Sequence, residues 1–397
     1  MEKNISLERA VKLVLVHAHV LPPVNVPIAK TVGLIMAEDI TADRDYPLFD
    51  RAMMDGFAVC TNDAGCKVES LGEVAAGDKL NKEVKKGFCV AIMTGAPCPP
   101  GTEAVVKIED VHIEKKKILL PSKIKSGQHF AKKGSECLKG DVIAGKGEII
   151  TPLILANLAT FNKAYIKVHK NPSLLIVTTG NELIQPEKEL SDAQIRDSNG
   201  PMLEAMARCS GISDIRKMHV EDTHQALARV LEQTPQFDIV IFTGGVSEGQ
   251  YDLVPDAFKN FGAKIIFHKV RQKPGKPMLF ATKGSTLLFG LPGTPLGTHL
   301  GFQRYVLPVI RKITGNNIGK EIFVGRLTSS LSIKSNRPVS VLAKAEKKGK
   351  LWHVTHLKGQ GSSDIFKPAL ANVYIVLPKG TYKLSSGSDV EFEMIWS

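Results

Sequence analysis

The sequence predicts a multidomain α/β protein in which a doubly wound domain is combined with a β-rich unit and a small C-terminal β-barrel-like domain. Residues 171 to 315 alternate apolar, β-branched runs with helical segments, which is the pattern of a doubly wound sheet. Short alternating segments between glycines and prolines occupy residues 71 to 125, and strand-like segments follow residue 320. A length of 397 residues is enough for two to four such domains.

Composition and charge describe an ordinary globular chain with a preference for anions. The net charge of +12 favours anionic partners. The lysines are dispersed or lie in short runs with few aromatic residues between them, so we expect a small polyanion and no nucleic acid. The six cysteines form no C-x-x-C pair, which favours reduced thiols over a zinc site or disulfides. Without a long apolar segment or a signal-peptide pattern, we expect a cytoplasmic protein and no membrane partner.

The chain begins with a predicted helix and continues into a charged loop. Ser6 is the expected N-cap, and the apolar residues 10, 11, 14 and 15 share one helix face. Residues 41 to 59, TADRDYPLFDRAMMDGFAV, are too polar and too rich in turn residues for a regular core element. Four aspartates beside two arginines make this loop a candidate for substrate contact, although surface salt bridges around a turn explain the same pattern.

The remaining elements follow in chain order. Within the β-rich unit, Thr94-Gly95 directly follows a predicted strand over residues 89 to 93. A helix over 152 to 160 and a strand over 164 to 168 precede the doubly wound region. In that region the predicted strands lie at 174–178, 212–219, 238–242, 263–270, 278–282 and 286–290, and the predicted helices at 199–210, 222–233, 252–261 and 295–313.

Two predicted strands of the doubly wound region end in a Thr-Gly sequence that polar side chains follow. The first tip reads Thr178-Thr179-Gly180-Asn181-Glu182, and the second reads Thr243-Gly244-Gly245, with Ser247, Glu248 and Asp252 shortly after it. Glycines at the carboxyl ends of parallel strands expose backbone N–H groups where open α/β sheets bind ligands. Such tips suit an oxyanion or a hydrated divalent cation. The alternative is that the glycines only supply turn conformations.

Two further loops of this region carry features of an anion site. Lys273-Pro-Gly-Lys276-Pro places two cations in a loop that prolines constrain. Leu291-Pro292-Gly293-Thr-Pro is a glycine turn before a predicted helix, whose amino end favours an anion.

These segments together resemble a known family. In their order along the chain, PLFDRAMMDGFAV, GEVAAGD, TGAPCPPGTEAVVKIED, TTGNEL, DSNGPML, TGGVSEGQYD, KPGKP and LPGTP are similar to the molybdopterin molybdenumtransferase family, MoeA, to which the E domain of gephyrin is related. The resemblance covers nearly the whole chain. It implies an enzyme that inserts molybdenum from molybdate into adenylylated molybdopterin and releases AMP, with Mg²⁺ as the cofactor. It also implies that the doubly wound domain is MogA-like.

The resemblance further implies a domain division and partners. The doubly wound domain would combine residues 1–22 with 171–317, and a connecting domain would combine 23–43 with 138–170. Residues 44–137 would form the β-rich domain, and 318–397 the C-terminal barrel. Family members are homodimers in which the substrate cleft is shared between subunits. A molybdopterin adenylyltransferase is the expected upstream partner.

The family's functional residues map onto the strand tips and the two loops. The resemblance implies catalytic roles for Asp55, Glu182, Asp222, Asp252, Lys273 and Lys276. It implies Mg²⁺ ligation by Glu182, Asp222 and Asp252. Substrate binding is expected from Thr94, Thr179, Gly180, Thr243, Gly244, Gly245, Ser247, Pro292 and Gly293. Asp55 and Thr94 would reach the cleft across the dimer.

The chain departs from the family pattern at several positions. Asn181 replaces an aspartate, Ala52 a serine and Thr294 an asparagine, and Ala131 stands where an arginine is typical. Phe366 and Lys367 occupy the place of a serine pair. The alternative functions are therefore a paralogue that binds molybdopterin or molybdate, or scaffolds partners, without turnover, and a nucleotide-processing enzyme such as an adenylyltransferase. Because adenylyltransferases are single-domain relatives, the additional β-domains argue against the second alternative.

Overall fold

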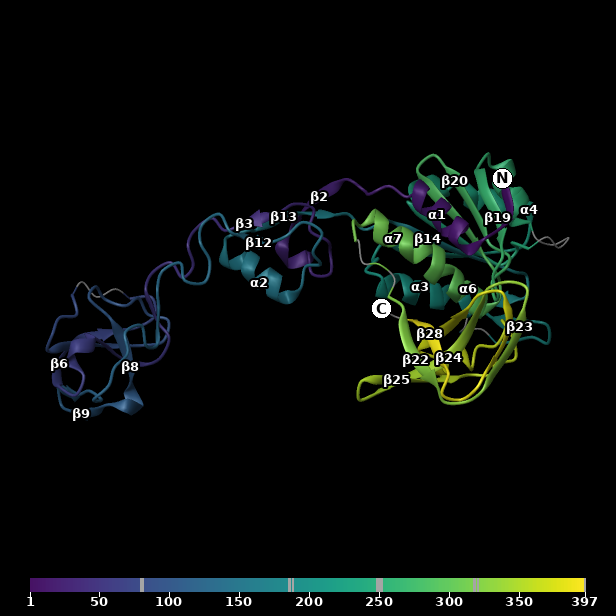
Figure 1. The fold of residues 1–397 in the computed structure, drawn as a ribbon. Coiled ribbons are helices and arrows are strands. Elements are labelled where there is room, and N and C mark those ends of the chain that lie inside the picture. Colours follow the sequence, from purple (N-terminus) through teal and green to yellow (C-terminus); the bar gives the residue numbers. More distant parts are fainter. Residues whose placement is uncertain are drawn as a thin grey trace. The chain divides into compact units, whose positions relative to one another are not determined.

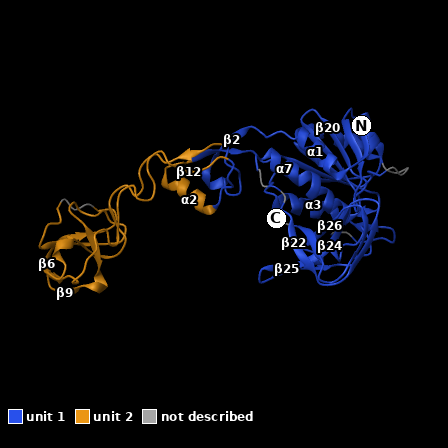
Figure 2. Cartoon of the chain, in the orientation of Figure 1, with its two compact units in different colours: residues 1–37, 147–151, 165–397 blue, residues 38–146, 152–164 orange. Residues whose placement is uncertain are grey.

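The structure is a computed structural model that describes residues 1–78, 82–184, 187, 189–247, 253–316, 319 and 321–395. These described residues group into two compact units, coloured separately in Figure 2. Unit 1 contains residues 1–37, 147–151 and 165–397, and unit 2 contains residues 38–146 and 152–164. Within the described part of the chain, no helix is long and apolar enough to cross a membrane.

The centre of unit 1 is a mixed sheet, for which the described residues supply seven strands. In spatial order they are β1 (Glu2–Ile5), β19 (Lys264–Val270), β20 (Leu279–Lys283), β21 (Thr286–Leu291), β18 (Ile239–Thr243), β14 (Leu174–Thr179) and β17 (Ile215–Val220). The strand β20 runs antiparallel to both of its neighbours, and the other pairings are parallel. The six strands predicted for this region are therefore present, with ends within three residues of the prediction.

Helices cover both faces of this sheet, as a doubly wound fold requires (Figure 1). One face packs against α1 (Leu7–His17), α3 (Asn199–Cys209) and α7 (Leu307–Ile313), and the other packs against α4 (His224–Leu231) and α5 (Val254–Asn260). Helix α6 (Pro295–Gly301) contacts β21 and α3, and its buried leucines pack with residues of the barrel. Alternate residues of β18 point to opposite faces: Ile241 lies in the first core and Phe242 in the second. The strands are buried on both sides, which explains their continuous apolar sequences.

Two details of unit 1 differ from the pattern in the sequence. The strand β1 was not predicted, because its four residues Glu-Lys-Asn-Ile carry no strand periodicity, yet it pairs in parallel with β19. The single helix predicted over 295–313 is divided by a π-helical turn, Phe302–Val306, from which α7 continues. The predicted cap of α1 is confirmed, since the Ser6 side chain accepts a hydrogen bond from the Arg9 amide.

The C-terminal part of unit 1 is a closed barrel, to which the described residues contribute five strands. Around the barrel they are β22 (Phe323–Leu327), β25 (Leu351–His356), β24 (Val339–Lys348), β26 (Val373–Leu377) and β28 (Asp389–Met394). A two-stranded ribbon of β23 (Leu331–Ser335) and β27 (Gly380–Leu384) extends from it. Its interior is an apolar core that includes Val354, Ile375 and Phe392, so the barrel is filled by side chains. The predicted barrel-like domain is confirmed.

Further pairs of short strands lie outside these sheets, in unit 1 and in unit 2, among the described residues. Strand β2 (Pro23–Pro27) pairs with β13 (Tyr165–His169), and β15 (Leu183–Ile184) pairs with β16 (Ile195–Arg196). In unit 2, β3 (Ile40–Thr41) pairs with β12 (Val142–Ala144).

Unit 2 is built on a second sheet, for which its described residues supply six strands. In spatial order they are β8 (Ala104–Lys107), β5 (Gly56–Val59), β7 (Phe88–Ile92), β6 (Lys67–Val74), β10 (Lys117–Leu119) and β9 (His112–Glu114). A separate ladder joins β4 (Arg51–Ala52) to β11 (Phe130–Ala131). The predicted helix over residues 152 to 160 is α2 (Pro152–Thr160). The expectation of a β-rich unit with tight turns is confirmed.

Candidate functional site

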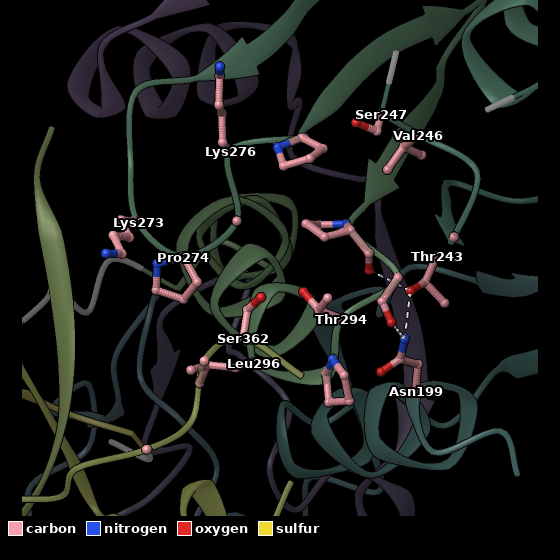
Figure 3. Close-up of a pocket in the computed structure, with 18 of the residues that line it drawn as sticks. Asn199, Thr243, Val246, Ser247, Lys273, Pro274, Lys276, Thr294, Leu296 and Ser362 are labelled. Atoms are coloured by element: carbon pink, nitrogen blue, oxygen red, sulfur yellow. Dashed lines mark hydrogen bonds between the residues drawn. The ribbon is translucent and has the colours of Figure 1, made fainter. Parts of the chain in front are cut away.

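A cavity of about 920 Å³ lies in unit 1, where the carboxyl ends of β14, β18 and β21 meet the barrel. The doubly wound domain lines it with both predicted strand tips, the Lys273–Pro277 loop and the Pro292–Pro295 turn. The barrel lines it with residues of β23 and β24. Figure 3 shows Lys273 and Lys276 on one side of this cavity and Asn199 with Thr243 on the other. Ligands of doubly wound folds bind at this edge of the sheet.

The tip of β18 is held rigidly by buried hydrogen bonds. The Thr243 side chain is only 1% exposed, and its hydroxyl donates to the Pro292 carbonyl at 2.9 Å. The same hydroxyl accepts from Asn199 Nδ2 at 3.1 Å, while that nitrogen also donates to the Gly293 carbonyl at 2.7 Å. Thr243 therefore fastens the Pro292–Gly293 turn to the sheet. Its hydroxyl is engaged within the protein.

Gly244 is required at this tip by close contact as well as by conformation. Its φ of +98° is one that side-chain-bearing residues rarely adopt. A Cβ atom here would lie 2.3 Å from the Thr179 carbonyl oxygen, because the tips of β14 and β18 pack directly against each other. The turn-only interpretation of this glycine is therefore insufficient. The next residue, Gly245, also has positive φ (+58°) and lines the cavity with Ser247.

The tip of β14 fixes a carboxylate in the cavity wall. The Thr179 hydroxyl donates a short hydrogen bond to Asp222 Oδ1, and the Asp222 amide donates to Asn181 Oδ1 at 3.0 Å. Asn181 thus holds Asp222 through its side-chain oxygen, which is an atom that an aspartate would also provide. Gly180 (φ +154°) brings Glu182 back toward the tip, where a Cβ atom would lie 2.7 Å from Glu182 Oε2.

The Lys273–Pro277 loop lies between the sheet and the barrel. The Lys273 amide donates to the Pro338 carbonyl at 2.9 Å, and the Lys273 carbonyl accepts from the Ser340 amide at 2.9 Å. Gly275 has a φ of +83° and separates the two lysines. Both lysines line the cavity. The predicted pair of constrained cations is therefore built against the start of strand β24.

Among the residues that the structure describes, cations outnumber carboxylates around the cavity. Among the lining residues that the structure describes, the cationic side chains are Arg196, Lys273, Lys276, Lys334 and Arg337, and the carboxylates are Glu182, Asp197 and Asp222. Asp197 is already used within the protein, since its Oδ1 accepts from the Gly200 amide at 2.9 Å. The excess of positive charge in a partly enclosed site favours an anionic ligand with more than one negative group.

The described residues include two of the three side chains expected to bind Mg²⁺. Glu182 and Asp222 line the same cavity and offer the oxygen ligands that Mg²⁺ prefers. Asp252, the third expected ligand, lies outside the described residues, as does Glu248. Among the residues that are described, no group of three His, Cys, Asp or Glu side chains is arranged to hold a metal ion.

The remaining two expected site residues lie together in unit 2. Asp55 Oδ1 accepts from the Thr94 amide at 2.6 Å and from the Thr94 hydroxyl at 2.7 Å. These two hydrogen bonds, that to the backbone first, hold the pKa of the Asp55 carboxyl below its ordinary value. Asp55 is therefore an exposed, ionised and oriented carboxylate at the third Thr-Gly tip.

Sequence reasoning missed several cavity residues. Asn199 lies within the quoted motif DSNGPML, but nothing in that motif indicated that its amide would join two loops. Lys334 and Arg337 come from the barrel, in a stretch without glycine signals or carboxylate partners. Only the packing of the barrel against the doubly wound domain brings them to the cavity.

The fold and this cavity together define a class of protein: a doubly wound domain with added β-domains and a cation-lined cavity at its strand tips. Three family models match the chain, in the order expected for one particular family. They are the MoeA N-terminal region (domain I and II) at residues 5–161, a probable molybdopterin binding domain at 175–312 and the MoeA C-terminal region (domain IV) at 324–395.

Whole-chain comparisons agree with these models. The chain is 31% identical to a molybdopterin molybdenumtransferase of Staphylococcus epidermidis over 98% of this chain and 94% of that protein. It is also 31% identical to the Staphylococcus aureus protein of that name, with the same coverage. A crystal structure of a molybdopterin biosynthesis MoeA protein from Pyrococcus horikosii superimposes with a TM-score of 0.80 at 27% identity, covering 99% of this chain and 100% of that one. The chain belongs to the MoeA family of molybdopterin molybdenumtransferases, which confirms the resemblance in the sequence.

Proposed function

We propose that this protein is a molybdopterin molybdenumtransferase, which inserts molybdenum from molybdate into adenylylated molybdopterin and releases AMP. The observation that carries the proposal is the cation-lined cavity at the strand tips of a chain that matches such transferases along its length. Molybdate is a divalent oxyanion, and the second substrate carries phosphates. Both are ligands for a site with an excess of fixed positive charge.

Different residues of the cavity bind different groups of the two substrates. Lys273 and Lys276 neutralise molybdate and the phosphoanhydride, and Arg337 adds a cation from the barrel. The Gly244 amide already donates to the Leu291 carbonyl at 3.3 Å, so the backbone N–H of Gly245, with the Ser247 hydroxyl, binds nucleotide phosphate. The carboxylates of Glu182 and Asp222 suit Mg²⁺, together with Asp252. When bound, Mg²⁺ neutralises charge on the phosphoanhydride that is cleaved.

The exposed carboxylate of unit 2 has a role in the same proposal. Asp55, oriented by Thr94, contacts the substrate in the cavity of a partner subunit. A rigid carboxylate on an exposed surface supports this role, because its hydrogen bonds keep it ionised and prevent rotation.

A homodimer is part of the proposal. Helix α2 has the sequence PLILANLAT, yet among its residues only Leu158 is buried, and Leu153 is 82% exposed. An apolar helix in this condition is the type of surface that a second subunit covers. We further propose that a molybdopterin adenylyltransferase supplies the substrate and that the reaction takes place in the cytoplasm.

The domain division from the sequence is also retained as a proposal. The pairing of β1 with β19 and the packing of α1 against the sheet support joining residues 1–22 to residues 171–317. The closed barrel supports a separate domain over 318–397. Residues 44–137 then form the β-rich domain, and 23–43 with 138–170 the connecting domain.

The deciding experiment measures AMP released from adenylylated molybdopterin by the purified protein, with and without molybdate and Mg²⁺. Release that requires both is the expected result, and it should be lost in Asp252→Asn. The matched control is Asp256→Asn, which removes an exposed carboxylate on α5 that forms an ion pair with Lys259 at 2.6 Å. A wild type that binds the adenylylated pterin but releases no AMP at any molybdate concentration would replace the transferase by the binding-only paralogue.

A further inference from the structure

The π-helical turn Phe302–Val306 contains two buried polar side chains that no role in the cavity explains. Arg304 is 6% exposed and Tyr305 is fully buried. Neither side chain lines the cavity, and neither belongs to a motif that the sequence pattern singled out. Single π-turns inside α-helices are rare and are frequently found at functional sites. The hydrogen bonds of these two residues lead to one loop.

Tyr305 reaches that loop through Gln272. The Tyr305 hydroxyl donates to Gln272 Oε1 at 2.5 Å, and Gln272 Nε2 donates to the Gly275 carbonyl at 2.9 Å. Gln272 is fully buried, so water does not replace either bond. Gly275 lies between Lys273 and Lys276 in the chain, directly before Lys276. The side-chain amide of Gln272 therefore connects the π-turn to the loop that carries both lysines.

Arg304 reaches the same loop by a second route. Its Nη2 donates to Ser340 Oγ at 2.6 Å. The Ser340 amide donates to the Lys273 carbonyl at 2.9 Å, which ties the first lysine to strand β24. Arg304 thus supports the loop at Lys273 through Ser340 of strand β24, and its neighbour Tyr305 supports the loop at Gly275 through Gln272. The loop is fixed on the protein side, and both lysine side chains remain available to the cavity.

We propose that Tyr305 is a positioning residue: through Gln272 it fixes the Gly275 carbonyl and so holds the backbone of the loop that presents Lys273 and Lys276 to the cavity. Arg304 supports the same loop through Ser340. The catalytic consequence rests on the proposed transferase function, whereas the effect on anion binding does not. Loss of the Tyr305 hydroxyl leaves Gln272 Oε1 without its partner, and the loop then samples positions in which the two lysines are displaced from the cavity.

The test compares two buried tyrosines. Tyr305→Phe removes the hydroxyl at Gln272, and Tyr374→Phe removes one that lies 2.9 Å from His299 Nδ1. Tyr374 is 1% exposed and also lies in unit 1, but neither Tyr374 nor His299 lines the cavity. The two variants therefore make the same chemical change at similar burial. Calorimetry on the full chain measures the Kd for molybdate and for inorganic phosphate, and thermal unfolding measures stability.

We expect Tyr305→Phe to weaken binding of both anions about tenfold, the loss that follows when a buried hydrogen bond no longer orients a charged group. Tyr374→Phe should lower the Tm similarly and leave both Kd values unchanged. In AMP release, Tyr305→Phe should raise the KM for molybdate more than it lowers kcat. Adding Gln272→Met to Tyr305→Phe should weaken binding little further, because both changes break one connection.

Three results would overturn the positioning role: unchanged anion affinity in Tyr305→Phe, an equal loss of affinity in Tyr374→Phe, or a wild type that binds neither anion. Failure of the transferase proposal looks different. In that case the wild type binds molybdate and responds to Tyr305→Phe as expected, but it releases no AMP.

Discussion

Thr-Gly tips occur in both units, and the same dipeptide is used in two different ways. At the tip of β18, Thr243 is 1% exposed, and a Cβ atom on Gly244 would lie 2.3 Å from a backbone oxygen. At the tip of β7, Thr94 is exposed, and a Cβ atom on Gly95 would meet nothing within 4 Å. The first tip is part of a packed wall, whereas the second presents a carboxylate, Asp55, at an exposed surface. Local sequence alone does not separate these two roles.

The largest expected effect comes from adding a methyl group at each tip. Gly244→Ala combines positive φ with a backbone clash, so it should lower the free energy of unfolding by about 3 kcal/mol and abolish AMP release. Gly95→Ala keeps a strained φ of +84° but meets no neighbour, so its cost should be about 1 kcal/mol. Urea denaturation measures the free energy of unfolding of both variants. Equal losses in the two variants would show that conformation alone, and not packing, requires glycine at the β18 tip.

A second change tests what the threonine at the tip of β14 holds in the packed wall. Thr179→Val removes the donor to Asp222 Oδ1, and we expect turnover to fall about 10- to 100-fold, as when a group that orients a ligating carboxylate is lost. Thr160→Val is the matched control, because its hydroxyl donates only to the Ala156 carbonyl at the end of α2. The measurement is AMP release at saturating molybdate. A wild-type rate in Thr179→Val would remove Asp222 from the reaction.

Acid should affect the two units in different pH ranges. Burial lowers the pKa of His299 in unit 1 to about 4, from an ordinary value of 6.5. Because the unfolded chain binds this proton first, the contribution is complete above pH 6.5 and is lost as the pH falls toward 4. The Asp55 contribution in unit 2 is present above its ordinary pKa of 3.8 and is lost only below that value. Thermal unfolding of wild type and His299→Gln between pH 7 and 4 should show a smaller pH dependence in the variant.

The smallest expected effect is on the titration of Asp55. Thr94→Val removes the hydroxyl donor but keeps the backbone amide, which is the larger cause of the lowered pKa. The pKa of Asp55 should therefore rise toward its ordinary value without reaching it, as followed by NMR of the carboxyl carbon. Thr102→Val, whose hydroxyl donates to the Pro99 carbonyl in the same unit, should leave it unchanged. An unchanged Asp55 pKa in Thr94→Val would assign the whole shift to the backbone.

Much of the fold and part of the site could be predicted from local patterns. The buried strands of the doubly wound domain, the cap of α1 and the three Thr-Gly tips follow from periodicity and from residue types that lie within a few positions of one another. The motif order also led to the family. These features depend on neighbours along the chain, so the sequence alone was sufficient to determine them.

Other features were decided only by the tertiary structure. Strand β1 exists because the edge of β19 accepts it, and its own sequence has no strand signal. Asn199 and Arg337 join the cavity through contacts between distant segments, as does the bond from Tyr305 to Gln272 across 33 residues. Whether a glycine tip is packed or open depends on which strand lies beside it. Such pairings are set by how layers pack in three dimensions, and no periodicity of the local sequence encodes them.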